Sequence, residues 1–161
     1  SRYANITFTG VPAGDADAQD RPSWAGETGS MLFLTIGRNL VKQADLGSLH
    51  IFDSGGMGGY VLEAVFRNTG GVHVAPQAVF VIKQRIMPES LPGVEYIGPG
   101  ILTEVARVDL GRSDTPVLPG RTRVLAVDYP YALDPGEYVA EVIAEYGGQA
   151  PASCSQDFVV P

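Results

Sequence analysis

The sequence predicts an all-β fold, an antiparallel sandwich of about seven to nine strands. Three observations carry this prediction. The chain of 161 residues contains 20 glycines and 12 prolines but only 18% charged residues, a composition that favours short strands joined by turns. Apolar and polar residues alternate repeatedly, in segments spaced by about ten residues. Almost no segment shows a helical period.

The alternation is clearest in residues 60–67, where Tyr60, Leu62, Ala64 and Phe66 share one face of the expected strand. Further strands are expected over residues 3–9, 30–36, 49–52, 78–83, 101–110, 121–127, 138–146 and 157–160. Residues 38–46 fit either a strand or a short helical turn. The strongest strands predict a core formed largely by Leu62, Ala64, Phe66, Val79, Val81, Val139 and Val142.

The N-terminal region is organised differently from the rest of the chain. Residues 1–9 form a strand that belongs to a preceding domain or docks from a distance, and residues 10–29 have a linker-like composition. The sandwich itself is expected over residues 30–161. Because the alternating N-terminal strand needs a sheet to cover it, we expect it to pair within the chain; pairing between molecules would make it a route to self-association. Trp24 either covers an end of the sandwich or anchors a partner.

Charge and cysteine content exclude several classes of function. The formal net charge is −7 and no basic stripe is present, which argues against nucleic-acid binding and against anionic membrane surfaces. No run of apolar residues is long enough for direct membrane insertion. The single cysteine, Cys154, excludes an internal disulfide and a cysteine-based metal site, and we expect a small, partly buried side chain there.

Three turn segments are distinctive. Residues 66–76 read F-R-N-T-G-G-V-H-V-A-P, residues 117–123 read V-L-P-G-R-T-R, and residues 133–138 read L-D-P-G-E-Y. Asn and Gly close turns between strands, and Pro-Gly presets φ and then allows its reversal. Tyr138 is suited to lay its ring at a core edge while its hydroxyl reaches water or backbone.

In this order, the three segments resemble those of immunoglobulin-like domains of bacterial cell-surface proteins, including the WxL-interacting family. The resemblance covers residues 29–161 and implies an immunoglobulin-like sandwich in an extracellular or cell-surface setting of the bacterial envelope. In that family a peptidoglycan-binding domain precedes a second sandwich implicated in host-component binding. The resemblance therefore implies a non-enzymatic module that binds a protein or a cell-wall glycan, or that spaces domains from the envelope. Residues 85–100 depart from the pattern, and this long excursion is where a function particular to this protein is best sought.

Two other functions are alternatives. A periplasmic pilus-assembly chaperone also uses an immunoglobulin-like sandwich, but it needs a second domain and a basic anchor for the carboxylate of its partner. Asp53-Ser54-Gly55 follows two apolar residues and resembles the catalytic turn of aspartic proteases, in which two carboxylates share a proton. Only one such turn is present, so that enzyme would need a dimer. A strand that ends in a Gly-rich turn with a solvated Asp53 is the favoured interpretation.

Metal sites are weakly indicated. The run from Asp15 to Asp20 could hold calcium, but the EF-hand pattern fails because Asp20 and Gly26 occupy its sixth and twelfth positions. The two histidines, His50 and His73, would need a carboxylate to complete a zinc site. No Gly-x-Ser-x-Gly or phosphate-binding loop occurs. We therefore assign no catalytic, cofactor-binding or metal-binding residue and expect no cofactor.

Overall fold

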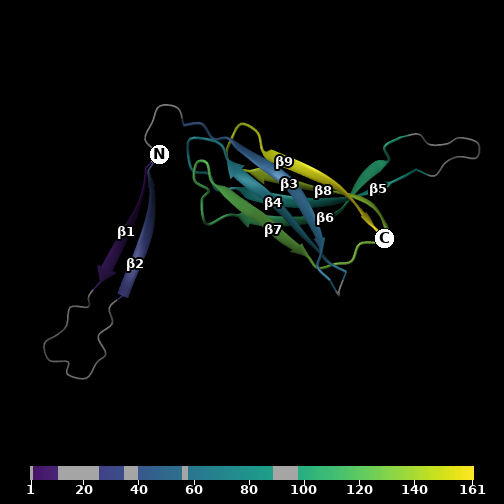
Figure 1. Ribbon diagram of the computed structural model, residues 1–161, viewed down its shortest axis with the longest axis horizontal. Helices are drawn as coiled ribbons and strands as arrows, with labels where there is room; N and C mark the ends of the chain where they lie inside the picture. Colours follow the sequence, from purple (N-terminus) through teal and green to yellow (C-terminus); the bar gives the residue numbers. More distant parts are fainter. Residues whose placement is uncertain (1, 11–25, 35–39, 56–57, 89–97) are drawn as a thin grey trace, which may run out of the picture. The chain divides into compact units, whose positions relative to one another are not determined.

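The computed structural model describes residues 2–10, 26–34, 40–55, 58–88 and 98–161 (Figure 1). The chain divides into two compact units, Ser1–Leu40 and Val41–Pro161. The described residues are all-β, and none of them forms a helix that could span a membrane.

The N-terminal unit is an antiparallel pair of strands. β1 (Arg2–Gly10) pairs with β2 (Gly26–Leu34) in a continuous register that runs from Arg2↔Leu34 to Gly10↔Gly26. The N-terminal strand thus pairs within the chain, but with the next strand in sequence and in a unit separate from the sandwich. The strand expected over residues 30–36 instead begins at Gly26 and pairs with β1, so the division falls at Leu40 and not at Gly29. An apolar run indicates a strand but does not reveal which partner it pairs with.

The second unit is an immunoglobulin-like sandwich of seven strands in two antiparallel sheets. One sheet has the order β3-β4-β7, with β3 at Ala44–Asp53, β4 at Tyr60–Asn68 and β7 at Thr122–Tyr129. The other has the order β6-β5-β8-β9, with β6 at Ile101–Arg112, β5 at Gln77–Ile86, β8 at Gly136–Glu145 and β9 at Ala152–Val160. The chain changes sheet after β4, β6 and β7, which is the connectivity of a Greek key.

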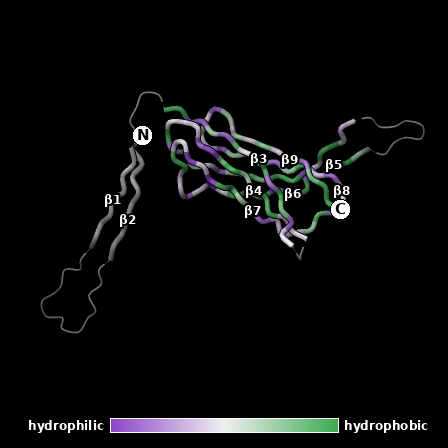
Figure 2. The backbone as a smooth tube through the Cα atoms, in the orientation of Figure 1, coloured by the Kyte–Doolittle hydropathy of each residue, from purple (hydrophilic) through white to green (hydrophobic). Residues whose placement is uncertain are grey.

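The core lies between the two sheets. Figure 2 shows hydrophobic and hydrophilic residues interspersed along the strands of this unit. Of the predicted core residues, Leu62, Ala64, Phe66 and Val142 belong to the core, as expected, whereas Val81 is buried but lies on the outer face of β5 with Val79. Val79 and Val139 are only half-buried, so their assignment to the core was wrong. They lie on the outer face, because Phe80 and Ala140 point inward. These central strands carry apolar residues on both faces, and alternation alone therefore could not identify the inner one.

The first two turn motifs meet at a buried asparagine. The side chain of Asn68, 0% exposed, donates from Nδ2 to the carbonyls of Val72 and Val117 at 2.8 Å each. Its Oδ1 accepts from the amide of Gly70 at 3.0 Å. Its own carbonyl accepts from Gly120 N at 2.8 Å. A single side chain therefore holds the two connecting segments together and leaves none of its polar atoms unsatisfied.

The third motif forms a tyrosine corner at the opposite end of the sandwich. The hydroxyl of Tyr138, near the start of β8, donates to the carbonyl of Asp134 at 2.8 Å, while the ring is buried. Burial raises the pKa of this hydroxyl, and the nearby Asp134 carboxylate adds to the shift. The expected placement of the ring and hydroxyl is confirmed.

Candidate functional site

The strands β5 and β6 extend past the end of the sandwich as a two-stranded ribbon (Figure 1). Pairing between β5 and β8 ends at Gln84↔Tyr138, but pairing between β5 and β6 continues to Ile86↔Ile101. The ribbon thus includes the first two residues of the excursion expected at residues 85–100, and β6 begins directly after it. Residues 89–97 of that excursion lie outside the described residues.

Large apolar side chains are exposed where the ribbon leaves the sandwich. Ile86, Met87, Ile101 and Leu102, which we call the ribbon base, are 46%, 54%, 58% and 47% exposed. Gly100 has a positive φ of 78°, and a Cβ there would lie 3.0 Å from Met87 Sδ, so the methionine packs against the glycine backbone. Val159 on the neighbouring β9 is 71% exposed. Ile86 and Ile101 are cross-strand partners on one face of the ribbon, and Leu102 lies on the other face with its partner Arg85. Single exposed apolar residues are ordinary, but several at one place are typical of an interaction surface.

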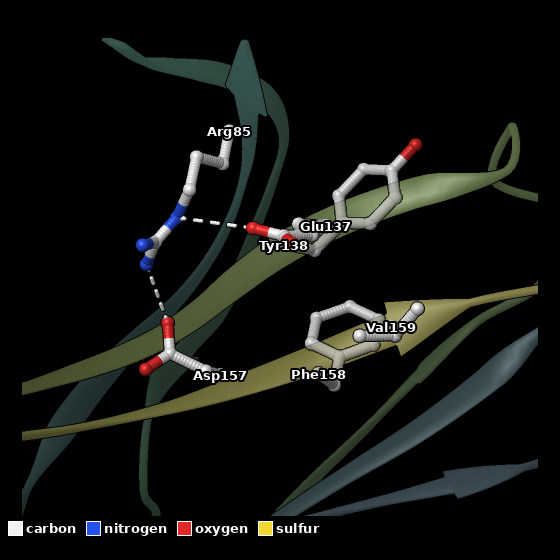
Figure 3. A pocket seen from close by; sticks show the side chains of 6 residues that line it. All are labelled: Arg85, Glu137, Tyr138, Asp157, Phe158 and Val159. Carbon is white, nitrogen blue, oxygen red and sulfur yellow. Dashed lines mark hydrogen bonds and ion pairs between the residues drawn. The ribbon is translucent and has the colours of Figure 1, made fainter. Parts of the chain in front are cut away.

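A hollow of about 290 Å³ lies beside the ribbon base (Figure 3). Its lining consists of Arg85, Glu137, Tyr138, Asp157, Phe158 and Val159. Three neighbouring strands supply these residues: β5 carries Arg85, β8 carries Glu137 and Tyr138, and β9 carries the rest. The rings of Tyr138 and Phe158 stack with centroids 5.4 Å apart, which gives the hollow a rigid aromatic side.

The guanidinium of Arg85 organises the polar side of the hollow. Its Nη2 donates to Asp157 Oδ1 at 2.9 Å, and its Nε lies 3.8 Å from Glu137 Oε2. That Nε is buried and makes no hydrogen bond to any described residue. Two carboxylates thus face one cation, so the lining carries a net charge of −1. This combination of hydrogen-bonding groups and aromatic surface provides the chemistry of ligand binding.

Asp53 lies at the end of β3 and is exposed. Its Oδ1 accepts a hydrogen bond from the amide of Gly55 at 2.8 Å, the geometry of an Asx turn. The carboxylate therefore stabilises its own turn. This is the structural role that the favoured interpretation gave to it.

The remaining candidate residues do not come together. His50 is exposed on β3 and stacks with Phe52, while His73 is half-buried in the connection between β4 and β5. Within the described ranges, no group of three His, Cys, Asp or Glu residues could hold a metal ion. Cys154 is half-buried against the core, and burial raises the pKa of its thiol. Asp15–Asp20 and Trp24 lie outside the described residues.

The sequence indicated the excursion that starts at Arg85, but it did not indicate which carboxylates pair with this arginine. Asp157 is 72 positions further along the chain, and only the pairing of β8 with both β5 and β9 brings the two residues together. No local motif signals such a contact.

Comparisons with known proteins bear on the fold alone. No protein-family model matches the chain, and no curated protein matches it. The crystal structure of the sporulation control protein Spo0M from Bacillus subtilis is similar, with a TM-score of 0.50 and 11% identity over 73% of this chain and 49% of that chain. This chain therefore spans about half the length of Spo0M. A family 3 β-glucosidase from Bifidobacterium adolescentis matches with a TM-score of 0.43 and 13% identity, over 74% of this chain and 17% of the enzyme.

Proposed function

We propose that the Val41–Pro161 sandwich is a non-enzymatic interaction module of a bacterial cell-surface protein and that it binds a protein partner at the ribbon base. The observation that carries this proposal is the exposure of Ile86, Met87, Ile101 and Leu102 at one end of the sandwich, with Ile86 and Ile101 side by side on one face of the ribbon. Ile86, Ile101 and Leu102 lie in paired strand, so the backbone of these three residues is held in shape before any partner arrives. An apolar centre bordered by charged groups such as Arg85 is the usual anatomy of a protein interface.

The cell-surface setting is part of the proposal. It is supported by the resemblance of the three turn segments to those of surface domains. Asn68 and Tyr138 give two of those segments a structural role that any such sandwich would need.

A cell-wall glycan is the second candidate partner. It is favoured by the hollow beside the ribbon base, where Arg85, Glu137 and Asp157 offer donors and acceptors next to the ring of Phe158. Sugar hydroxyls pair with charged groups of this kind, and sugar rings pack on aromatic faces.

The test compares two surfaces of equal exposure. The chain carrying Met87→Ser and Leu102→Ser is measured against the Phe52→Ser chain, whose altered residue is 50% exposed on β3. Each chain is immobilised and exposed separately to the envelope proteins of the producing bacterium and to its purified peptidoglycan. We expect the double variant to lose protein binding and Phe52→Ser to keep it. Equal binding by all chains would refute the proposal, and peptidoglycan binding that Asp157→Ala abolishes would establish the glycan alternative.

A further inference from the structure

A second surface, distinct from the ribbon base, lies along the free edge of β7. The register between β4 and β7 runs without a shift from Tyr60↔Tyr129 to Arg67↔Thr122. The other edges of the described sandwich are protected. β3 and β6 carry register shifts, and β9 packs alongside β3. A regular edge strand with unpaired backbone groups is a template for another strand.

A basic hollow of about 440 Å³ adjoins the start of this edge. Its lining is Thr115, Pro116, Val117, Leu118, Arg121, Thr122 and Arg123. The guanidinium of Arg123 donates to the carbonyl of Thr115 at 2.6 Å and to the hydroxyl of Ser113, which holds it in place. Arg121 is exposed, and its backbone N–H donates to Leu118 across the turn.

The two guanidiniums of this hollow are not neutralised. No carboxylate lines it, and neither Arg121 nor Arg123 forms an ion pair with a described carboxylate. By contrast, Lys83, Arg85 and Arg107 on the other sheet are all paired. In a chain with a net charge of −7, a hollow with two guanidiniums that pair with no described carboxylate favours an anionic ligand.

The direction of β7 indicates which kind of anion would bind in the basic hollow. β7 starts at the hollow and runs away from it, so a strand added antiparallel to β7 ends at the hollow. We propose that β7 accepts an extended peptide as an antiparallel edge strand, and that Arg121 and Arg123 bind the free carboxylate at the C-terminus of that peptide. Pro116, Val117 and Leu118 give the hollow an apolar side, which suits an apolar last residue. Main-chain pairing supplies the affinity, and carboxylate capture sets the position of the peptide.

The probe is a library of octapeptides immobilised through their N-termini, made once with free C-terminal carboxylates and once as C-terminal amides. The full chain should bind members of the free-carboxylate library that end in an apolar residue, and it should bind the matching amides at least about tenfold more weakly. Arg121→Glu should weaken this binding by at least about tenfold as well. Arg112→Glu makes the same change of charge on β6, outside the hollow, and should change binding less than about twofold.

Amide chemical shifts of the chain provide the second readout. A bound peptide should perturb residues 121–129 and slow hydrogen exchange along β7, while the ribbon-base variants should bind the peptide normally. The proposal is overturned if no free-carboxylate peptide binds, if amides bind equally well, or if the shifts map elsewhere. It is also overturned if β7 proves to be occupied by a second copy of the chain, seen as a dimer in sedimentation that Arg121→Glu leaves intact.

Discussion

The Asn68 turn and the ribbon base lie at opposite ends of the sandwich. They differ in how completely their polar groups are hydrogen-bonded and their apolar side chains are buried. At the Asn68 end, a fully buried amide joins Val72, Val117 and Gly70 through its side chain. At the ribbon end, large apolar side chains stand in solvent, and the Nε of Arg85 makes no hydrogen bond within the described part of the chain. The Asn68 network stabilises the fold at the same end as the Arg121–Arg123 hollow, whereas the ribbon base leaves apolar area exposed. Substitution of Asn68 should therefore lower stability, whereas substitution of a ribbon-base residue should change stability little.

The largest effect is expected for Asn68→Ala. The substitution removes three hydrogen bonds and leaves the carbonyls of Val72 and Val117 buried without their donor. Each such loss costs about 1–3 kcal/mol, so we expect the free energy of unfolding to fall by roughly 3–5 kcal/mol. Urea unfolding followed by circular dichroism measures the change. A loss below about 1 kcal/mol would mean that water replaces the side chain and that this end is less closed than it looks.

Gly70→Ala should come next. A Cβ at Gly70 would lie 2.5 Å from the carbonyl oxygen of Val41 and 2.6 Å from the amide nitrogen of Gln43, so the backbone would have to shift. We expect a loss of about 2–3 kcal/mol. Gly120→Ala is the matched control, because Gly120 has a φ of 73° but open space around it. Backbone strain alone should cost the control about 1 kcal/mol, and equal losses at both positions would argue against steric crowding at Gly70.

Tyr138→Phe probes the ribbon end, where the tyrosine corner ties β8 to the preceding turn. The change removes the hydrogen bond to Asp134 and should cost about 1 kcal/mol near neutral pH. Thermal unfolding of the two chains measures the difference. A cost above about 3 kcal/mol would show that this end depends on its turn as strongly as the Asn68 end does.

Tyr138 should also make the free energy of unfolding depend on pH. Burial raises the pKa of the Tyr138 hydroxyl, so the folded chain keeps its proton at pH values where the unfolded chain loses it. The stabilising contribution is present below the unfolded pKa of about 10 and is lost as the pH rises through the folded pKa. Urea titrations between neutral and strongly alkaline pH should show a smaller loss of stability for Tyr138→Phe. Parallel curves would contradict this assignment.

The sequence predicted the fold better than the site, for a physical reason. Alternation along β4 and the turn chemistry at Asn68, Gly120 and Tyr138 are local properties, and they correctly indicated the strands and the class of fold. The partner of β2 and the inner face of β5 depend on which strands meet, which a single segment does not encode. The ion pair between Arg85 and Asp157 depends on the same information, as does the position of Arg121 beside a free edge.

The smallest effect on stability is expected at the ribbon base, and it decides whether the comparison between the two ends holds. Ile101→Ser removes a side chain that is 58% exposed, so little burial is lost and the free energy of unfolding should change by less than about 0.5 kcal/mol. Leu62→Ala, at a position that is 1% exposed, should cost about 2–5 kcal/mol in the same urea titration. A loss above about 1 kcal/mol for Ile101→Ser would mean that the ribbon base is already covered within the chain. The surface would then serve folding, and the open end of the sandwich would have no apolar area left to offer a partner.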